Sequence, residues 1–107
     1  MTKVSTSIIS TSANSAKLRG DLTMHTVADI LPQGLDLLKQ AKSNWRLDLA
    51  EVEQVSSAGV ALLLEWLKAA EKSGITLELQ DFPERMLSII QISGLEPLFL
   101  PLFRTTP

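Results

Sequence analysis

Ser57 is the side chain of this chain whose position most favours a functional role. It follows an alternating, strand-like segment that ends at Val55, and it precedes the apolar run at residues 60–64. A serine at a strand-to-helix junction can cap the helix, because its hydroxyl accepts a hydrogen bond from an unpaired backbone amide. Ala58 and Gly59 keep the first turn free of bulk, so a partner, a phosphate or a carboxylate can approach the positive end of the helix dipole. The alternative is a purely structural cap, with the glycine needed for tight helix–strand packing.

Other side chains that could support catalysis or metal binding are few and scattered. His25 is the only histidine and there is no cysteine, which excludes a thiolate nucleophile and a His/Cys metal cluster within this chain. His25 is interpreted as a surface residue, and Glu51 and Glu53 as charges of a solvated loop. Asp48 lies near the end of a predicted strand, where it either faces a ligand or bonds to nearby amides.

Composition narrows the function classes further. No phosphate-binding glycine loop, dinucleotide fingerprint or nucleophile elbow is present, so we expect no enzyme activity, no cofactor and no metal. Lys and Arg total 10 against 12 Asp and Glu, giving a net charge of -2. This balance lacks the dense positive charge that nucleic acids or anionic membranes attract. The N-terminal residues show no signal peptide, and no apolar run is long enough to span a bilayer. We therefore expect a protein-interaction module.

The first half of the chain predicts a hairpin followed by a helix. Serine, threonine and isoleucine favour a strand over residues 5–14, with a turn at residues 13–15 and a second strand over residues 16–19. The alternative is that the first dozen residues form a disordered polar tail. Apolar residues recur at helical spacing over residues 26–42, but Pro32 interrupts them. A first turn should therefore end near Leu31, or the helix should kink there.

The second half predicts alternating strands and helices. Strands are expected over residues 45–49 and 75–79, helices over residues 58–72 and 83–93, and a short helix or extended segment over residues 96–103. The order ββαβαβα predicts a single α/β domain over residues 1–107, with helices packed on a mixed, mostly parallel sheet. The apolar tail at residues 98–103 either packs back on the domain or docks onto a partner or a bilayer, and packing back is preferred.

The helix expected after Ser57 carries two apolar stripes. One stripe suits burial against the sheet and consists of Val60, Leu63, Leu64 and Leu67. The second, on another side, consists of Leu62, Trp66 and Ala69. Either a neighbouring helix covers this second stripe, or Leu62 and Trp66 anchor a partner, since large aromatic residues dominate interface energetics. The predicted partner-binding residues are Ser56, Ser57, Ala58, Gly59, Leu62 and Trp66.

The sequence around Ser57 resembles that of the STAS domain family. The matching segments are Leu47-Asp48-Leu49 and the stretch over residues 55–64, in which Ser57, Ala58 and Gly59 fall on the hydroxyl, small and glycine positions of the family pattern. The segment at residues 19–23 also resembles the Gly-Asp-Leu step that ends the second strand of these domains. This family includes anti-sigma-factor antagonists and regulatory domains associated with transporters.

One departure from the family pattern separates two functions. Ser56 stands where phosphorylation-regulated antagonists carry an aspartate before the serine that a kinase modifies. The segments at residues 20–23, 59–64 and 98–101 are similar to MlaB-type proteins, which are cytoplasmic STAS subunits of an ABC transporter that moves phospholipid between bacterial membranes. This resemblance implies a cytoplasmic accessory subunit, held at the inner membrane by its partner, that binds the transporter ATPase and supports outer-membrane lipid asymmetry. The alternative is an anti-sigma-factor antagonist whose partner kinase phosphorylates Ser57.

Overall fold

The serine-rich N-terminal segment forms a hairpin, as predicted, rather than a disordered tail. The structure is a computed structural model that describes residues 6–104; Ser5, the start of the predicted first strand, and most of the segment assessed for a signal peptide lie outside that range. Strand β1 (Ser7–Ser12) pairs antiparallel with β2 (Ser15–Leu22). Asn14 fixes the turn to the rest of the sheet, because its side-chain oxygen accepts from the Lys42 amide at 2.8 Å and its carbonyl from the Arg46 amide at 2.8 Å.

Strand β3 occupies the centre of the sheet and is much longer than predicted. It runs from Asn44 to Val55, so residues 50–54 belong to the strand rather than to a loop. Within the described chain the sheet has the order β1-β2-β3-β4-β5, with β4 (Thr76–Gln80) and the two-residue β5 (Phe103–Arg104) parallel to β3. The predicted mixed, mostly parallel sheet is confirmed, and β5 is an additional strand that the sequence analysis missed.

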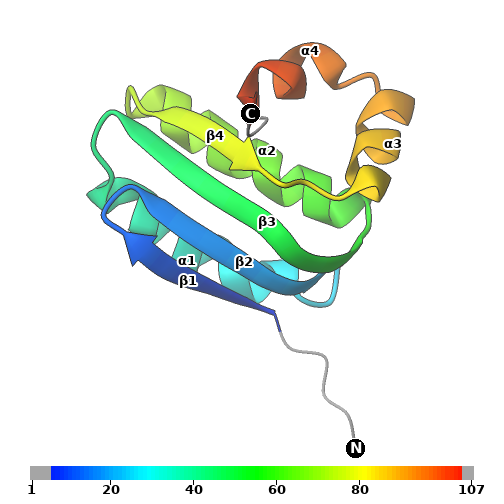
Figure 1. Cartoon of the computed structure of the whole chain (residues 1–107), viewed down its shortest axis with the longest axis horizontal. Helices are drawn as coiled ribbons and strands as arrows, with labels where there is room; N and C mark the ends of the chain where they lie inside the picture. Colours follow the sequence, from blue (N-terminus) through cyan, green and yellow to red (C-terminus); the bar gives the residue numbers. More distant parts are fainter. Residues whose placement is uncertain (1–5, 105–107) are drawn as a thin grey trace, which may run out of the picture.

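Helices α1 (Val27–Gln40) and α2 (Ser57–Lys72) cover one face of this sheet and leave the other open (Figure 1). Helix α1 continues through Pro32, so the prediction that a turn ends near Leu31 is wrong. Although proline removes one helical hydrogen bond, Ile30 and Leu38 on either side of it are buried in the core. The packing of these buried side chains outweighs the cost of the hydrogen bond lost at Pro32.

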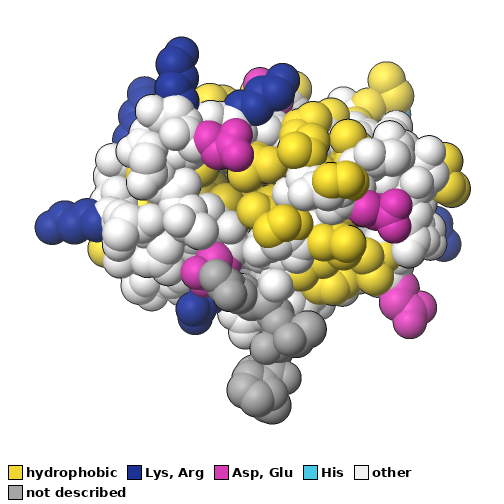
Figure 2. Space-filling view, turned by 90° about the horizontal axis from the view of Figure 1, so that it is seen from above, with side chains coloured by type: hydrophobic (Ala, Val, Ile, Leu, Met, Phe, Trp, Pro, Cys, Tyr) yellow, Lys and Arg dark blue, Asp and Glu magenta, His cyan; other side chains and the backbone are white. Residues whose placement is uncertain are grey.

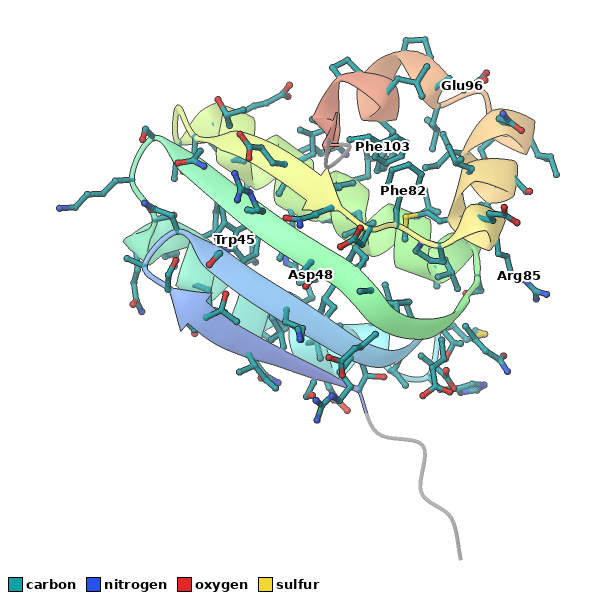
Figure 3. All side chains as sticks on the ribbon, viewed as in Figure 1. Trp45, Asp48, Phe82, Arg85, Glu96 and Phe103 are labelled. Carbon is teal, nitrogen blue, oxygen red and sulfur yellow. The ribbon has the colours of Figure 1, made fainter. Side chains whose placement is uncertain are left out.

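The C-terminal segment packs back onto the domain. Helix α3 (Glu84–Ile92), the short α4 (Glu96–Phe99) and the 3-10 turn η1 (Leu100–Leu102) lead to β5. Phe103 stacks on Phe82 with a centroid distance of 3.8 Å (Figure 3), and Phe99 is fully buried. Leu98 and Leu100 remain 47% and 53% exposed, and hydrophobic side chains gather on the surface seen from the α4 side (Figure 2). Over residues 6–104, no helix is both long and apolar enough to cross a membrane.

The contact between α1 and α2 depends on the absence of a side chain at Gly34. A Cβ atom there would lie 2.2 Å from Cζ2 of Trp66, whose ring is wholly buried and packs edge-on against Trp45 at 5.7 Å. The indole also donates a hydrogen bond to the Leu31 carbonyl at 3.1 Å. A side chain at position 34 would therefore force the Trp66 ring to shift.

Gly34→Ala is expected to destabilise the domain by about 1–3 kcal/mol, because overpacking outweighs the gain in helix propensity. Urea unfolding followed by circular dichroism measures this change. The control Gln33→Ala, on the exposed neighbour, should stay within about 0.5 kcal/mol of the parent. Equal stability of both variants would show that the α1–α2 contact is looser than the structure indicates.

Candidate functional site

Ser56, and not Ser57, caps helix α2. The Ser56 hydroxyl accepts a hydrogen bond from the Ala58 amide at 3.2 Å, and Ser56 has the extended backbone of an N-cap residue. Ser57 is the first helical residue and is exposed. The prediction that Ser57 is the cap is therefore wrong by one residue. This shift leaves the Ser57 hydroxyl without a hydrogen-bond partner in the described chain and available at the surface.

Gly59 holds the first turn of α2 directly against the end of β2. A Cβ atom at this position would lie 2.8 Å from both the carbonyl oxygen and the Cβ of Leu22. The backbones are also joined, since the Ser56 amide donates to the Leu22 carbonyl at 3.0 Å. The two segments singled out by the family resemblance, residues 19–23 and 55–59, thus meet in one rigid junction.

The amides of the first turn are largely satisfied within the helix start. The Gly59 amide donates to the Ser56 carbonyl at 2.9 Å and the Val60 amide donates to the same oxygen at 3.4 Å, while the Ala58 amide bonds to the Ser56 hydroxyl. Fewer donors are therefore free for a phosphate or carboxylate than the sequence analysis expected. The turn is better suited to contact by a protein surface than to capture of a small anion.

Asp21 supports the junction from the β2 side. Its carboxylate accepts from the Gln54 amide at 3.2 Å, and its carbonyl accepts from the hydroxyl of the buried Thr26 at 2.6 Å. A second hydroxyl, that of Thr6, also donates to this carbonyl. In the sequence, Asp21 stands out only as part of a family motif. Its signal was a lone acidic residue directly after Gly20, the strand glycine with a positive φ of 98°.

A shallow apolar groove runs beside the Ser57 turn, between α1 and α2. It has a volume of about 220 Å³. Its lining residues are Val27, Ala28, Leu31, Ala58, Ala61, Leu62 and Glu65. Alanines at three of these positions leave the space that longer side chains would fill. The groove extends the surface around Ser57 along the first two turns of α2.

Trp66 is buried and cannot anchor a partner from this surface, which corrects the prediction. Its ring is 0% exposed, because α1 covers the second apolar stripe of α2 and Gly34 makes room for the indole. Leu62 is also buried at 3% exposure, although it still lines the base of the groove. Among the predicted contact residues, Ser57 is exposed, and Ser56 and Ala58 are half-buried. Gly59 acts through close packing.

The open face of the sheet carries paired charges. Glu51 lies on β3, not in a solvated loop, and its carboxylate contacts Lys17 Nζ at 2.7 Å and Arg19 Nε at 2.8 Å. The hydrogen bond from Lys17, followed by that from Arg19, lowers the pKa of Glu51, and the same bond raises the pKa of Lys17. Asp48 accepts from the Ala50 amide at 2.9 Å, which supports its structural interpretation.

The described residues bring no catalytic or metal-binding cluster together. His25 is exposed, and its imidazole has no hydrogen bond to a serine or a carboxylate in residues 6–104. Over the same residues, no group of three His, Cys, Asp or Glu side chains could hold a metal ion. The candidate site in this part of the chain consists of Ser57, Ala58, Ala61 and the α1–α2 groove, and we term it the docking surface.

The comparisons with known proteins identify the family. A family model described as "Mlab, STAS domain" matches residues 9–101, which include both segments of the junction. The chain is a member of the STAS domain family. No curated protein sequence matches it.

Solved structures share the fold of this STAS domain at low sequence identity. The unphosphorylated anti-sigma factor antagonist SpoIIAA matches with a TM-score of 0.72 and 19% identity, covering 96% of this chain and 89% of that one. A sulfate transporter family protein from Wolinella succinogenes matches with a TM-score of 0.69 and 21% identity, covering 91% and 80%. A STAS protein from Planctomyces limnophilus gives 0.73 and 15%, covering 98% and 92%.

Ser56→Ala is expected to destabilise the STAS domain by about 0.5–2 kcal/mol, because it removes the N-cap of α2. Ser57→Ala should stay within about 0.5 kcal/mol of the parent, since this hydroxyl is exposed. Thermal or chemical denaturation of both variants measures the difference. A larger loss of stability for Ser57→Ala than for Ser56→Ala would show that Ser57 is the N-cap.

Titration should report the ion pairs of the open face. The pKa of Glu51 is expected below its ordinary value of 4.5, and Lys17→Met should raise it part of the way back while Arg19 remains. Because the folded-state pKa is lowered, the stabilisation by these pairs is present above pH 4.5 and is lost as the pH falls through the lowered pKa. Carboxyl-carbon NMR measures the shift. The control Lys39→Met, on α1, should leave the Glu51 pKa unchanged.

Proposed function

We propose that this STAS domain is a non-catalytic accessory subunit that binds the ATPase of a phospholipid-transport ABC transporter through its docking surface. In this role it is cytoplasmic, is held at the inner membrane by its partner, and supports the lipid asymmetry of the outer membrane. The observation that carries the proposal is an exposed Ser57 on a rigid helix start beside an apolar groove. Such a surface combines a fixed polar point with room for a partner's apolar side chains.

Two features of the chain support docking over catalysis. The junction of α2 with β2 is fixed by Gly59 and by the Ser56–Leu22 hydrogen bond, so its surface is preorganised and loses little entropy on binding. The groove is lined almost wholly by apolar side chains, with Glu65 at one border. The similarity of residues 20–23, 59–64 and 98–101 to MlaB-type proteins motivates the choice of an ABC ATPase as partner.

The second candidate is an anti-sigma-factor antagonist regulated by a kinase at Ser57. It is favoured by the exposure of Ser57 at the first helical position, where a phosphate would lie at the positive end of the dipole. No acidic residue occupies the first turn of α2, so such a phosphate would meet no like charge there. Ser56 replaces the acidic neighbour of the phosphorylated antagonists, and we therefore rank this function second.

Co-expression with the cognate ATPase tests the first function. Ser57→Arg and Ala61→Arg are expected to weaken the complex at least about tenfold, since each places a long charged side chain on the docking surface. The matched control Ser88→Arg, an exposed position on α3, should bind like the parent. Calorimetry on the purified proteins gives the affinities. No complex, or a complex insensitive to both docking-surface variants, contradicts the proposal.

Ser57→Ala separates the two candidates. It retains a small side chain and should keep ATPase binding within about threefold, whereas it removes the only atom at this position that a kinase could modify. Incubation of the parent with a candidate kinase and ATP, followed by intact-mass measurement, detects the modification. A phosphoryl adduct that is absent from Ser57→Ala would reverse our ranking.

A further inference from the structure

Strand β1 forms an unpaired edge of the sheet. It stands first in the strand order and pairs only with β2 among the described strands. Its outer side therefore presents a row of backbone donors and acceptors that match another extended chain. Natural proteins protect such edges, because an exposed edge readily pairs with a further strand.

The two edges of this sheet differ in their protection. The far edge is β5, which has two residues and directly follows the η1 turn. By contrast, β1 has six residues, Ser7–Ser12, none of them charged and none of them proline. It also exposes 43% of the Ile9 side chain, whereas Ile8 on the opposite side of the strand packs partly into the core. The β1 edge thus lacks the charges that keep edges apart.

We propose that β1 pairs antiparallel with β1 of a second copy of this chain. Charge and symmetry favour a second copy as the pairing partner. Two uncharged strands approach without repulsion, and a two-fold axis perpendicular to the sheet generates an antiparallel pair from identical strands. The pair brings isoleucines of the two β1 strands close together, and β-branched cross-strand pairs stabilise a sheet. The register shift between Ser10 and Ser12 confines the regular part of the contact to residues 7–10.

The strand that pairs in this dimer is distinct from the docking surface. Because the axis is perpendicular to the sheet, the helical layers of the two copies lie on the same side of one continuous sheet. Neither Ser57 nor any residue lining the α1–α2 groove belongs to β1. The dimer would therefore present two docking surfaces in the same direction, which suits a partner that is itself two-fold symmetric. The pairing does not depend on the proposed ATPase partner.

Disulfide trapping tests the register, since the chain contains no cysteine of its own. In an antiparallel two-fold pair one residue faces its own copy, with Cα atoms about 5 Å apart and within disulfide reach. Each adjacent residue lies about 8 Å from its own copy and is out of reach. Among Ser7→Cys, Ile8→Cys, Ile9→Cys and Ser10→Cys, one variant should form a disulfide dimer at several times the yield of its neighbours. Ser88→Cys, exposed on α3, is the control.

Sedimentation velocity measures the unlinked pair. The parent chain should show a concentration-dependent dimer, and Ile9→Lys should raise its dissociation constant at least about tenfold by placing charge on the edge. The control Ile92→Lys, at an 87% exposed position on α3, should leave it unchanged. A parent that stays monomeric at millimolar concentration, equal low disulfide yields at all five positions, or a dimer unaffected by Ile9→Lys would each overturn the proposal.

Discussion

The contact between the first turn of α2 and the end of β2 determines where every part of the candidate site lies. Gly59 permits a separation that a single added carbon would prevent, because that carbon would lie 2.8 Å from the Leu22 carbonyl oxygen. The Ser56–Leu22 hydrogen bond then fixes the direction in which α2 leaves the sheet. Since α1 packs on α2, the same contact also positions the groove between the two helices. The position of the docking surface is thus a consequence of backbone packing.

Trp66 shows why sequence periodicity identified an apolar stripe but not its environment. A helical stripe containing a tryptophan has the same appearance whether a partner or a neighbouring helix covers it. The deciding residue is Gly34, which lies 32 positions away and has no side chain to report the contact. The cavity it leaves accepts the indole, whose N–H bonds to the Leu31 carbonyl and so satisfies the one polar atom of the ring. No local pattern around Trp66 contains that information.

Local patterns did predict the hairpin, the main helices and the parallel order, because apolar spacing and turn residues are local properties. They failed where tertiary contacts outweigh propensity. Residues 50–54 were predicted as a loop because two register shifts against β2 interrupt the alternation of β3. Pro32 predicted a helix end or a kink, yet α1 continues through it because Ile30 and Leu38 are buried in the core. Strand β5 was not predicted because two residues are too few to show an alternating pattern. The stacking of Phe103 on Phe82 places these residues beside β4.

Ser56, which stands where the phosphorylation-regulated antagonists carry aspartate, is the N-cap of α2. Serine and aspartate are both strong N-cap residues, so replacing one by the other preserves the helix start. What changes is charge, because an aspartate would place a carboxylate directly beside the Ser57 hydroxyl and serine does not. Since the Ser56 hydroxyl accepts the hydrogen bond from the Ala58 amide, Ser57 takes no part in capping. Contact of Ser57 with a partner, or its modification by a kinase, would therefore cost the fold little stability. The capping residue and the exposed hydroxyl are therefore two different serines, one residue apart.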